Sequence, residues 1–313
     1  MMFGSRSGNI PGLSPPAVLI FFHIPKAGGT TMNTILQHCL ADKYFNIGFG
    51  EEPPDTSLWV YSTARIAKKF HQLSAMRQGE VRCMGGDHLT YDVHTIFDQP
   101  SRFFTILRHP VDRVISNFFF LQTWRSLPCY RFIKDLTLEQ YLDSGIGLDQ
   151  DNQQVRMVSG CRELDAPWDP EGRPISTPPV ERLHLEMAKR NIEERFIVAA
   201  PLEQFTALVW FLKRLYGWPL HRVLFRIANK NANRPRLENV SEAARKRLET
   251  LNQYDIELYE WVKARFAKQI EPLEPNFSRE VRRFELRTRF IQRIAEHCPQ
   301  AIYTIACDLL FRS

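Results

Sequence analysis

The fold is decided by the stretch Ile20-Phe21-Phe22-His23-Ile24-Pro25-Lys26-Ala27-Gly28-Gly29-Thr30-Thr31. The apolar run of residues 17–22, which overlaps its beginning, predicts a buried strand. A Pro and two Gly then interrupt the pattern, and apolar residues at helical spacing follow at Met32, Ile35, Leu36, Cys39 and Leu40. We therefore expect a strand, a glycine loop and the N-terminus of a helix in direct succession.

Such a loop is suited to bind an anion, because its backbone N–H groups and the positive end of the helix dipole point to the same place. Gly28 and Gly29 let the backbone approach a phosphate with no Cβ in the way. Lys26 adds a mobile positive charge, and Thr30 and Thr31 add hydroxyl donors. We predict a phosphate-binding loop; the alternative is a turn that needs Gly only for its shape.

The loop does not match the Walker A pattern G-x-x-x-x-G-K-S/T, which is typical of kinases and NTPases. Lys26 precedes the two glycines, and no Gly lies five residues ahead of it. A nucleotide kinase is therefore the less favoured interpretation of this phosphate loop.

Length and composition allow one large α/β domain, with or without an appendage, in a chain of 313 residues that is 44% hydrophobic. A net charge of +6 favours anionic ligands. By itself it leaves nucleic acid, acidic polysaccharide, a membrane surface and a doubly phosphorylated nucleotide open. The six Cys are scattered without C-x-x-C pairs or Cys/His metal spacing, so we expect free thiols and no metal site.

The two ends of the chain differ in character. Residues 1–16 are small, polar and rich in Pro and Gly, and we expect a disordered lead-in. The apolar run 17–22 is too short for a signal-peptide core or a membrane span. The chain as given is therefore expected to be cytoplasmic, with any attachment at the inner membrane surface being peripheral.

Residues 271–313 are expected to form a basic helical tail. Apolar residues there alternate with Arg279, Arg282, Arg283, Arg287, Arg289 and Arg293. Three interpretations stay open: a solvated helix face, a helix on a membrane surface, and a contact with a partner or second copy. The apolar end of the tail, residues 301–311, is too short to span a bilayer and carries Asp308.

Strand patterns alternate with helical patterns along residues 17–270. Further strands are predicted at 81–86, 102–108 and 195–200, and helices at 59–78, 111–124, 137–142, 151–159, 180–191, 202–216 and 241–267, the last as one or two helices with Ser241 as N-cap. Residues 163–179 hold five Pro and predict a long surface loop. This alternation predicts an α/β fold, a P-loop-like three-layer sandwich with a central parallel sheet flanked by helices, plus a helical C-terminal tail.

A second candidate phosphate-binding element follows the predicted strand 102–108. Arg108 leaves the carboxyl end of this strand, Pro110 suits the first turn of the next helix, and Ser116 lies about two turns along it. Arg offers a planar fork of donors to phosphate oxygens, and Ser offers one compact hydroxyl. The aromatic residues Phe118 to Phe120 that follow are expected to be core rather than a stacking platform for adenine.

Both elements resemble those of sulfotransferases. The order Pro-Lys-x-Gly-Gly-Thr-Thr is similar to their 5′-phosphosulfate loop, and Arg108 with Ser116 eight residues on is similar to their 3′-phosphate element. Residues 151–160, 188–196 and 229–235 resemble carbohydrate O-sulfotransferases of the heparan and uronyl 2-O-sulfotransferase type, with their bacterial relatives.

The resemblance covers residues 18–270 and departs from the family in two places. Family members usually have Asp at the position of His109, and often Ser or Thr around Ala27. The first departure puts the local salt-bridge pattern in question but leaves Arg108 in place. We therefore expect a sulfotransferase domain over residues 17–270.

The resemblance implies a reaction and its components. The sulfate donor would be 3′-phosphoadenosine 5′-phosphosulfate (PAPS), the product nucleotide adenosine 3′,5′-bisphosphate, and no metal would be needed. The acceptor would be a hydroxyl of a poly- or oligosaccharide or a glycolipid, with no nucleic-acid partner. Which acceptor it is, and the oligomeric state, stay open. A non-catalytic module that binds anionic glycans on the same fold is the main alternative.

The resemblance also implies roles for single residues. Lys26 would contact the leaving phosphate, and Arg108 with Ser116 would hold the 3′-phosphate. His88, which follows Gly85-Gly86-Asp87, is the candidate general base, because an imidazole that titrates near neutrality suits proton abstraction from a sugar hydroxyl. Arg234, in an Asn-rich loop, would close over the nucleotide.

Other polar residues keep two interpretations each. His23 is either a second polar group of the cleft or structural, whereas His94 and His109 are weaker candidates. Gln153 and Arg156 either face the acceptor or lie on a solvated helix face.

Overall fold

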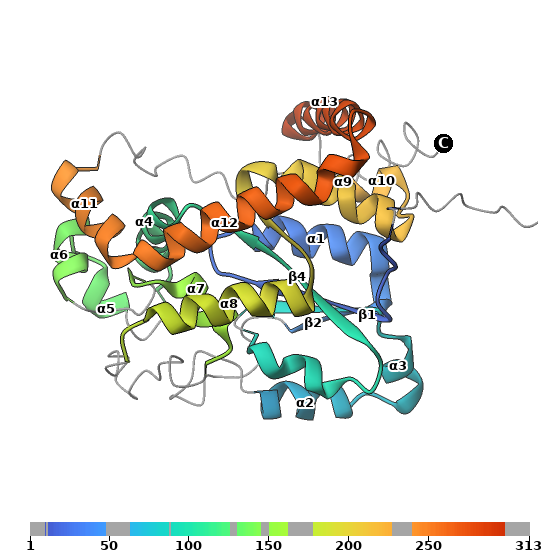
Figure 1. Ribbon diagram of the computed structural model, residues 1–313, viewed down its shortest axis with the longest axis horizontal. Coiled ribbons are helices and arrows are strands. Elements are labelled where there is room, and N and C mark those ends of the chain that lie inside the picture. The colour runs from blue at the N-terminus through green and yellow to red at the C-terminus, as the bar shows by residue number, and fades with distance from the viewer. Residues whose placement is uncertain are drawn as a thin grey trace, which may run out of the picture.

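A parallel sheet of five strands forms the centre of the protein (Figure 1). The computed structural model describes residues 10, 12–47, 63–87, 89–125, 130–144, 150–161, 178–226 and 240–297. The strands are β1 (Val18–His23), β2 (Tyr44–Ile47), β3 (Cys83–Asp87), β4 (Ser101–Leu107) and β5 (Phe196–Pro201), in the order β2-β3-β1-β4-β5. Each strand pairs in parallel with its neighbours, so all the carboxyl ends lie at the same edge of the sheet.

The strands form because they bury apolar side chains on both faces. Every residue of β1 and β5 is buried, as expected for a parallel sheet covered by helices on each side. On one face Phe21 stacks on Phe104 with ring centroids 4.8 Å apart. On the other face Phe22 meets Phe103 edge-on at 5.7 Å.

Helices lie on both faces of this sheet (Figure 1). They are α1 (Gly29–Leu40), α2 (Thr63–His71), α3 (Ala75–Glu80), α4 (Pro110–Leu121), α5 (Tyr130–Ile133), α6 (Leu138–Ser144), α7 (Gln153–Ser159), α8 (Arg182–Arg195), α9 (Phe205–Tyr216), α10 (Leu220–Val223), α11 (Glu242–Leu251), α12 (Gln253–Ile270) and α13 (Asn276–His297). Short 3-10 turns occur at Ala41–Lys43, Tyr91–Ile96, Leu202–Gln204 and Glu271–Leu273. In Figure 1, α1, α9 and α10 lie above the sheet and α2 with α3 lies below it.

The C-terminal helix α13 packs on the outside of α9 (Figure 1). Trp210 of α9 contacts Phe284 of α13 with ring centroids 5.2 Å apart, and its indole N–H donates to Glu280 at 2.9 Å. Phe277, Phe284 and Ile291 of α13 belong to the same apolar core as the strands. One face of this helix is therefore part of the core of the protein.

A second apolar cluster joins α4 to α5, α6 and α11 beside the sheet. Its buried members are Val111, Val114, Ile115, Phe118, Leu121, Ile133, Tyr141, Leu142, Ala244 and Leu248. Ser241 caps α11, because its hydroxyl accepts the Ala244 N–H at 3.2 Å, and it also contacts Glu139 at 2.8 Å. The predicted N-cap is thus confirmed, and the cluster holds one side of the helix that carries Ser116.

The predicted central parallel sheet flanked by helices, with helices at the C-terminus, is confirmed. The strands predicted at 17–22, 81–86, 102–108 and 195–200 match β1, β3, β4 and β5 within two residues. The cysteines in the described ranges, Cys39, Cys83 and Cys161, are free thiols, as expected.

Several elements differ from the prediction. The edge strand β2 was not predicted, because it has only four residues, which include the exposed Asn46 and carry no long apolar run. The pattern at 59–78 becomes two helices within the described residues, because Ser74 caps a new helix by accepting the Arg77 N–H. In the lead-in, Ile10 is buried and Leu13 packs against the same core, so these two residues are ordered by contact with the domain.

Candidate active site

The topology of the sheet selects one place for a ligand. After β1 the chain passes to β2 and β3 on one side, whereas after β4 it passes to β5 on the other side. In open α/β sheets ligands bind where neighbouring strands diverge in this way, outside their carboxyl ends. The predicted loop follows the end of β1 at His23, and Arg108 follows the end of β4 at Leu107.

The loop between β1 and α1 has the backbone of an anion site. Lys26 has a φ of 68° and Gly28 a φ of 86°, and Gly28 is the N-cap of α1 without any side-chain cap. Its carbonyl accepts the Met32 N–H at 3.2 Å, which starts the helix. The first turn of α1 carries no acidic residue, so the positive end of the helix dipole is not neutralised by its own helix.

Gly29 is required by packing. His23 is buried and stacks on Phe21 with ring centroids 5.4 Å apart. A Cβ at Gly29 would lie only 1.7 Å from the His23 Nε2 atom. The imidazole of His23 therefore fills the space between the sheet and the start of α1, which is a structural role.

Lys26 reaches over helix α4. Its Nζ atom lies 3.6 Å from the centre of the Phe120 ring, in a cation–π contact. Ser116 and Phe120 are four residues apart, so they share one face of α4. The contact therefore brings the loop next to the face that bears Ser116. Phe118 is core, as predicted, but Phe120 is half-buried beneath the lysine.

Arg108 links the loop to the rest of the site. Its Nη1 atom donates to the carbonyl of Lys26 at 3.0 Å. Its own backbone is held by the side chain of Gln154, the second residue of α7. The Arg108 N–H donates to Gln154 Oε1 at 3.0 Å, and Gln154 Nε2 donates to the Arg108 carbonyl at 3.0 Å. The sequence predicted Arg108 but gave no role to Gln154.

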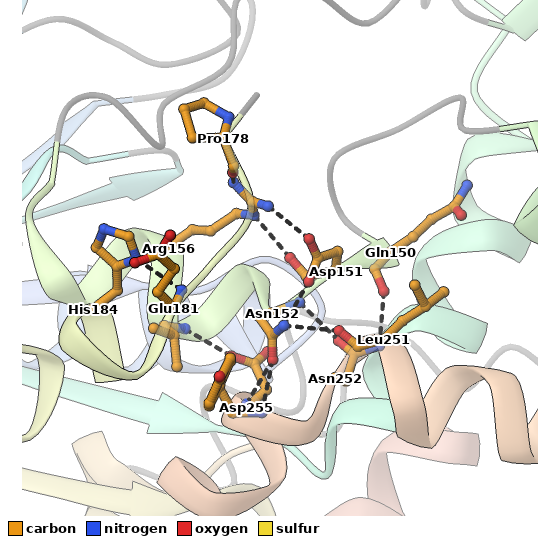
Figure 2. A network of polar contacts seen from close by, with 12 residues as sticks. Gln150, Asp151, Asn152, Arg156, Pro178, Glu181, His184, Leu251, Asn252 and Asp255 are labelled. Carbon is orange, nitrogen blue, oxygen red and sulfur yellow. Dashed lines mark hydrogen bonds and ion pairs between the residues drawn. The ribbon is translucent and has the colours of Figure 1, made fainter. Parts of the chain in front are cut away.

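Helices α7 and α12 cap each other at their N-termini (Figure 2). Asn152 Oδ1 accepts the backbone N–H groups of Tyr254 and Asp255 at 2.9 Å each, at the start of α12. In return the Asp255 carboxylate accepts the N–H groups of Gln154 at 3.0 Å and Val155 at 2.7 Å, at the start of α7. Each helix therefore supplies the N-terminal cap of the other.

Asn252 completes the buried network (Figure 2). Its Nδ2 atom donates to the carbonyls of Gln150 at 2.7 Å and Leu248 at 2.9 Å, and its Oδ1 accepts the Asn152 N–H at 3.1 Å. Burial raises the pKa of Asp255 to about 6, opposed by the positive charge of Arg113 and by the two backbone N–H donors. The network is buried, and Gln154 projects from it to Arg108.

Arg156 does not lie on a solvated helix face. It is 4% exposed, and its guanidinium donates to Asp151 Oδ2 at 2.7 Å and to the carbonyls of Asp151 at 2.9 Å and Pro178 at 3.1 Å (Figure 2). The interpretation as a solvated helix face was therefore wrong for this residue, whereas a contact with the acceptor stays a prediction. Arg156 thus links α7 to the chain segments at Asp151 and Pro178. Gln153, at the start of the same helix, is half-buried.

The remaining predicted residues fall into two groups. Thr30 is exposed, Thr31 is buried, Ala27 is buried, and Pro25 and Ser116 are half-buried. His88 and Arg234 lie outside the described residues, so the predicted base and the closing loop stay predictions. The weaker candidates have packing roles, because His94 packs on Tyr91 and Phe103, and His109 on Tyr259.

Within the described ranges no group of three or more His, Cys, Asp or Glu could hold a metal ion. What the described site offers is one lysine, one arginine and the N-terminus of a helix at adjacent strand ends. The fold and this site together define an α/β protein equipped to bind a ligand with phosphate-like groups.

Comparison with known proteins shows the family of the chain. The family model described as galactose-3-O-sulfotransferase matches residues 3–305. Heparan-sulfate 6-O-sulfotransferase 1 of Homo sapiens is 26% identical over 321 residues, which cover 90% of this chain and 74% of the relative. Galactose-3-O-sulfotransferase 3 of Mus musculus is 25% identical over 190 residues, which cover 60% of this chain and 43% of the relative.

The chain belongs to the galactose-3-O-sulfotransferase family, because the family model spans nearly all of it. The two relatives are carbohydrate sulfotransferases that, by name, act at a 6-O and a 3-O position. They support the predicted class of carbohydrate sulfotransferases as a whole, and not the 2-O-sulfotransferase type in particular.

The packing of Gly29 on His23 can be tested by a single methyl group. Gly29→Ala is expected to lower the free energy of unfolding by about 1–3 kcal/mol, because the new Cβ overlaps the imidazole. The control is Gly79→Ala in α3, where nothing lies within 4 Å of the new Cβ. It should raise stability by up to about 1 kcal/mol. Urea unfolding measures both, and equal stabilities for the two variants would contradict the packing.

The reciprocal caps can be tested at Asp255. Asp255→Ala is expected to lower the free energy of unfolding by roughly 2–4 kcal/mol, because two N–H groups of α7 lose their buried acceptor. The matched control is Asp98→Ala at an exposed position, expected within about 0.5 kcal/mol of wild type. Denaturant unfolding followed by circular dichroism gives both values. A loss no larger than that of the control would show that the network carries little stability.

Proposed function

We propose that this protein transfers a sulfuryl group from PAPS to a hydroxyl of a carbohydrate acceptor. The observation that carries the proposal is the 3.0 Å hydrogen bond from Arg108 to the Lys26 carbonyl. It joins the two predicted phosphate-binding elements at the carboxyl ends of adjacent strands. Family membership supports the reaction class.

The residues of the site fit a nucleotide with two separate phosphate positions. Lys26 and the N-terminus of α1 form one positive region, and Arg108 forms a second one at the next strand end. Lys and Arg side chains together with backbone N–H groups can balance phosphate charge, so the proposal includes no Mg²⁺. Ser116 would join Arg108 on the 3′-phosphate, because its face of α4 lies next to the loop.

Transfer of a sulfuryl group resembles phosphoryl transfer, with a loose transition state, in-line attack and charge developing on the leaving group. Lys26 would donate to the leaving 5′-phosphate with the loop N–H groups, Thr30 and Thr31. To reach that phosphate its ammonium would exchange the Phe120 ring for phosphate oxygens. The cation–π contact with Phe120 is worth about 1 kcal/mol.

His88 is the proposed general base. It directly follows Asp87, which ends β3 and pairs in register with His23 at the end of β1. This position in the sequence supports a base close to the loop. His88 would accept the proton of the acceptor hydroxyl while the new oxygen–sulfur bond forms and the bond from sulfur to the phosphate oxygen breaks. Arg234 is proposed to close over the bound nucleotide.

The acceptor class follows from the relatives. The names of the two relatives contain heparan sulfate and galactose. We therefore propose a saccharide hydroxyl of an oligo- or polysaccharide or of a glycolipid as acceptor, with the 2-hydroxyl kept as one of the positions to assay.

The donor site can be tested by calorimetry with adenosine 3′,5′-bisphosphate, with and without Mg²⁺. We expect binding that does not need the metal. Lys26→Ala and Arg108→Ala should each weaken it about 10- to 100-fold, because each removes a charge-assisted hydrogen bond. Arg102→Ala is the matched control. Arg102 lies near the amino end of the same strand β4, whereas Arg108 follows its carboxyl end.

Two outcomes would contradict the proposal. If Lys26→Ala and Arg108→Ala left the affinity for adenosine 3′,5′-bisphosphate unchanged, the assignment of the donor site would be wrong. If the protein bound ATP and required Mg²⁺ to do so, a kinase would be favoured. Transfer of labelled sulfate from PAPS to heparan-derived and galactose-terminated oligosaccharides then separates an enzyme from a glycan-binding module. His88→Asn serves there as a variant that keeps nucleotide binding and loses transfer.

Gln154 is expected to position Arg108 for nucleotide binding. Gln154→Leu keeps the approximate size of the side chain but removes both hydrogen bonds to the Arg108 backbone. We expect about tenfold weaker binding of adenosine 3′,5′-bisphosphate, since two neutral hydrogen bonds are lost. The neighbouring Gln153→Leu is the control. A Gln154→Leu variant with wild-type affinity would mean that Arg108 is held in place without the clamp.

A further inference from the structure

Helix α13 (Asn276–His297) has one face that the core does not cover. Its other face is fixed by Phe277, Phe284 and Ile291, which are buried, and by Glu280, which accepts from Trp210. The uncovered side, here called the α13 outer face, consists of Arg279, Arg282, Arg283, Leu286, Arg287, Arg289, Phe290 and Arg293, all exposed. It bears six arginines and is therefore strongly basic.

Two apolar side chains lie in the middle of these arginines. Leu286 is 59% exposed and Phe290 is 54% exposed, and they are one helical turn apart. Within the described residues the other large hydrophobic side chains exposed to this degree are Met76 and Leu183, which lie on different helices. An adjacent pair on a basic helix is therefore a feature of α13 in particular.

Acidic side chains of α13 lie beside this face. Glu285 lies at the edge of the outer face and pairs with Arg289 at 2.6 Å, and Glu280 lies on the packed side. The six arginines outnumber the one glutamate at the edge of the face, and they surround two exposed hydrophobic residues. This combination is typical of helices that lie in the interface of an anionic bilayer, with the apolar side chains inserted and the arginines at the headgroups.

We propose that the α13 outer face binds the surface of a bilayer that contains anionic lipids. Charge complementarity supplies the attraction, and Leu286 and Phe290 supply apolar area that only a partner with an apolar interior can bury. An acidic polysaccharide would match the charge but leave these two side chains in water. No described helix is long and apolar enough to cross a membrane.

This surface is separate from the candidate active site. The helix packs on the outside of α9, and the contacts of Lys26 and Arg108 are made with α4 and α7 instead (Figure 1). Binding to lipid can therefore be measured without nucleotide, and nucleotide binding can serve as a check that variants of α13 are folded.

The test is co-sedimentation of the full chain with vesicles of phosphatidylcholine alone or with about one third phosphatidylglycerol. Wild type should bind the anionic vesicles at least about tenfold more strongly. The variant Arg279→Glu with Arg283→Glu should lose at least about 25-fold, since each basic residue near the surface contributes about fivefold. The matched control is Lys246→Glu with Lys268→Glu, two exposed lysines on α11 and α12 that should have little effect.

The apolar part is tested by Leu286→Ser with Phe290→Ser, and Met76→Ser with Leu183→Ser is its control. We expect the first pair to lose binding to anionic vesicles about tenfold or more and the second pair to keep it. Equal losses in test and control variants would overturn the proposal. The proposal would also be overturned if the wild-type protein did not bind vesicles but bound heparin, and if Arg279→Glu with Arg283→Glu weakened that heparin binding. The outer face would then be a polysaccharide site.

Discussion

The double hydrogen bond between the Gln154 side chain and the Arg108 backbone is the contact on which the site depends. It satisfies both the N–H and the carbonyl of a residue that has just left the sheet, where no neighbouring strand supplies partners. Arg108 is thereby fixed in direction, and its guanidinium reaches the carbonyl of Lys26. The spacing between the two candidate phosphate-binding elements is consequently set by α7, which belongs to neither.

Helix α7 can do this because it is anchored at its N-terminus. It has only seven residues, too short to be stable alone, and the exchange of caps with α12 through Asn152 and Asp255 compensates for its length. A buried network of this kind helps only when each member is satisfied. Within the stretch 151–160, which resembles a family motif, Asn152 and Arg156 therefore hold the chain in place.

The positive charge of the protein is arranged in two different ways. Lys26 and Arg108 are half-buried, and a helix terminus and a fixed hydrogen-bond network direct them to one small volume. The arginines of α13 are exposed and spread over four turns of a helix. The first arrangement suits a compact anion with defined geometry, whereas the second suits an extended anionic surface. The net charge of +6 could not distinguish them.

The sequence by itself determined four of the five strands, most helices, the glycine loop and the place of Arg108, because apolar periodicity and the backbone preferences of Gly and Pro act within a few residues. Only the tertiary structure decided the rest. Strand β2 exists because β3 offers it partners. Gly29 is needed because His23 lies against it. Gln154 meets Arg108 across 46 positions, and Asn152 meets Asp255 across 103. A side chain's partner at such separation is set by the packing of whole elements, and no local pattern records it.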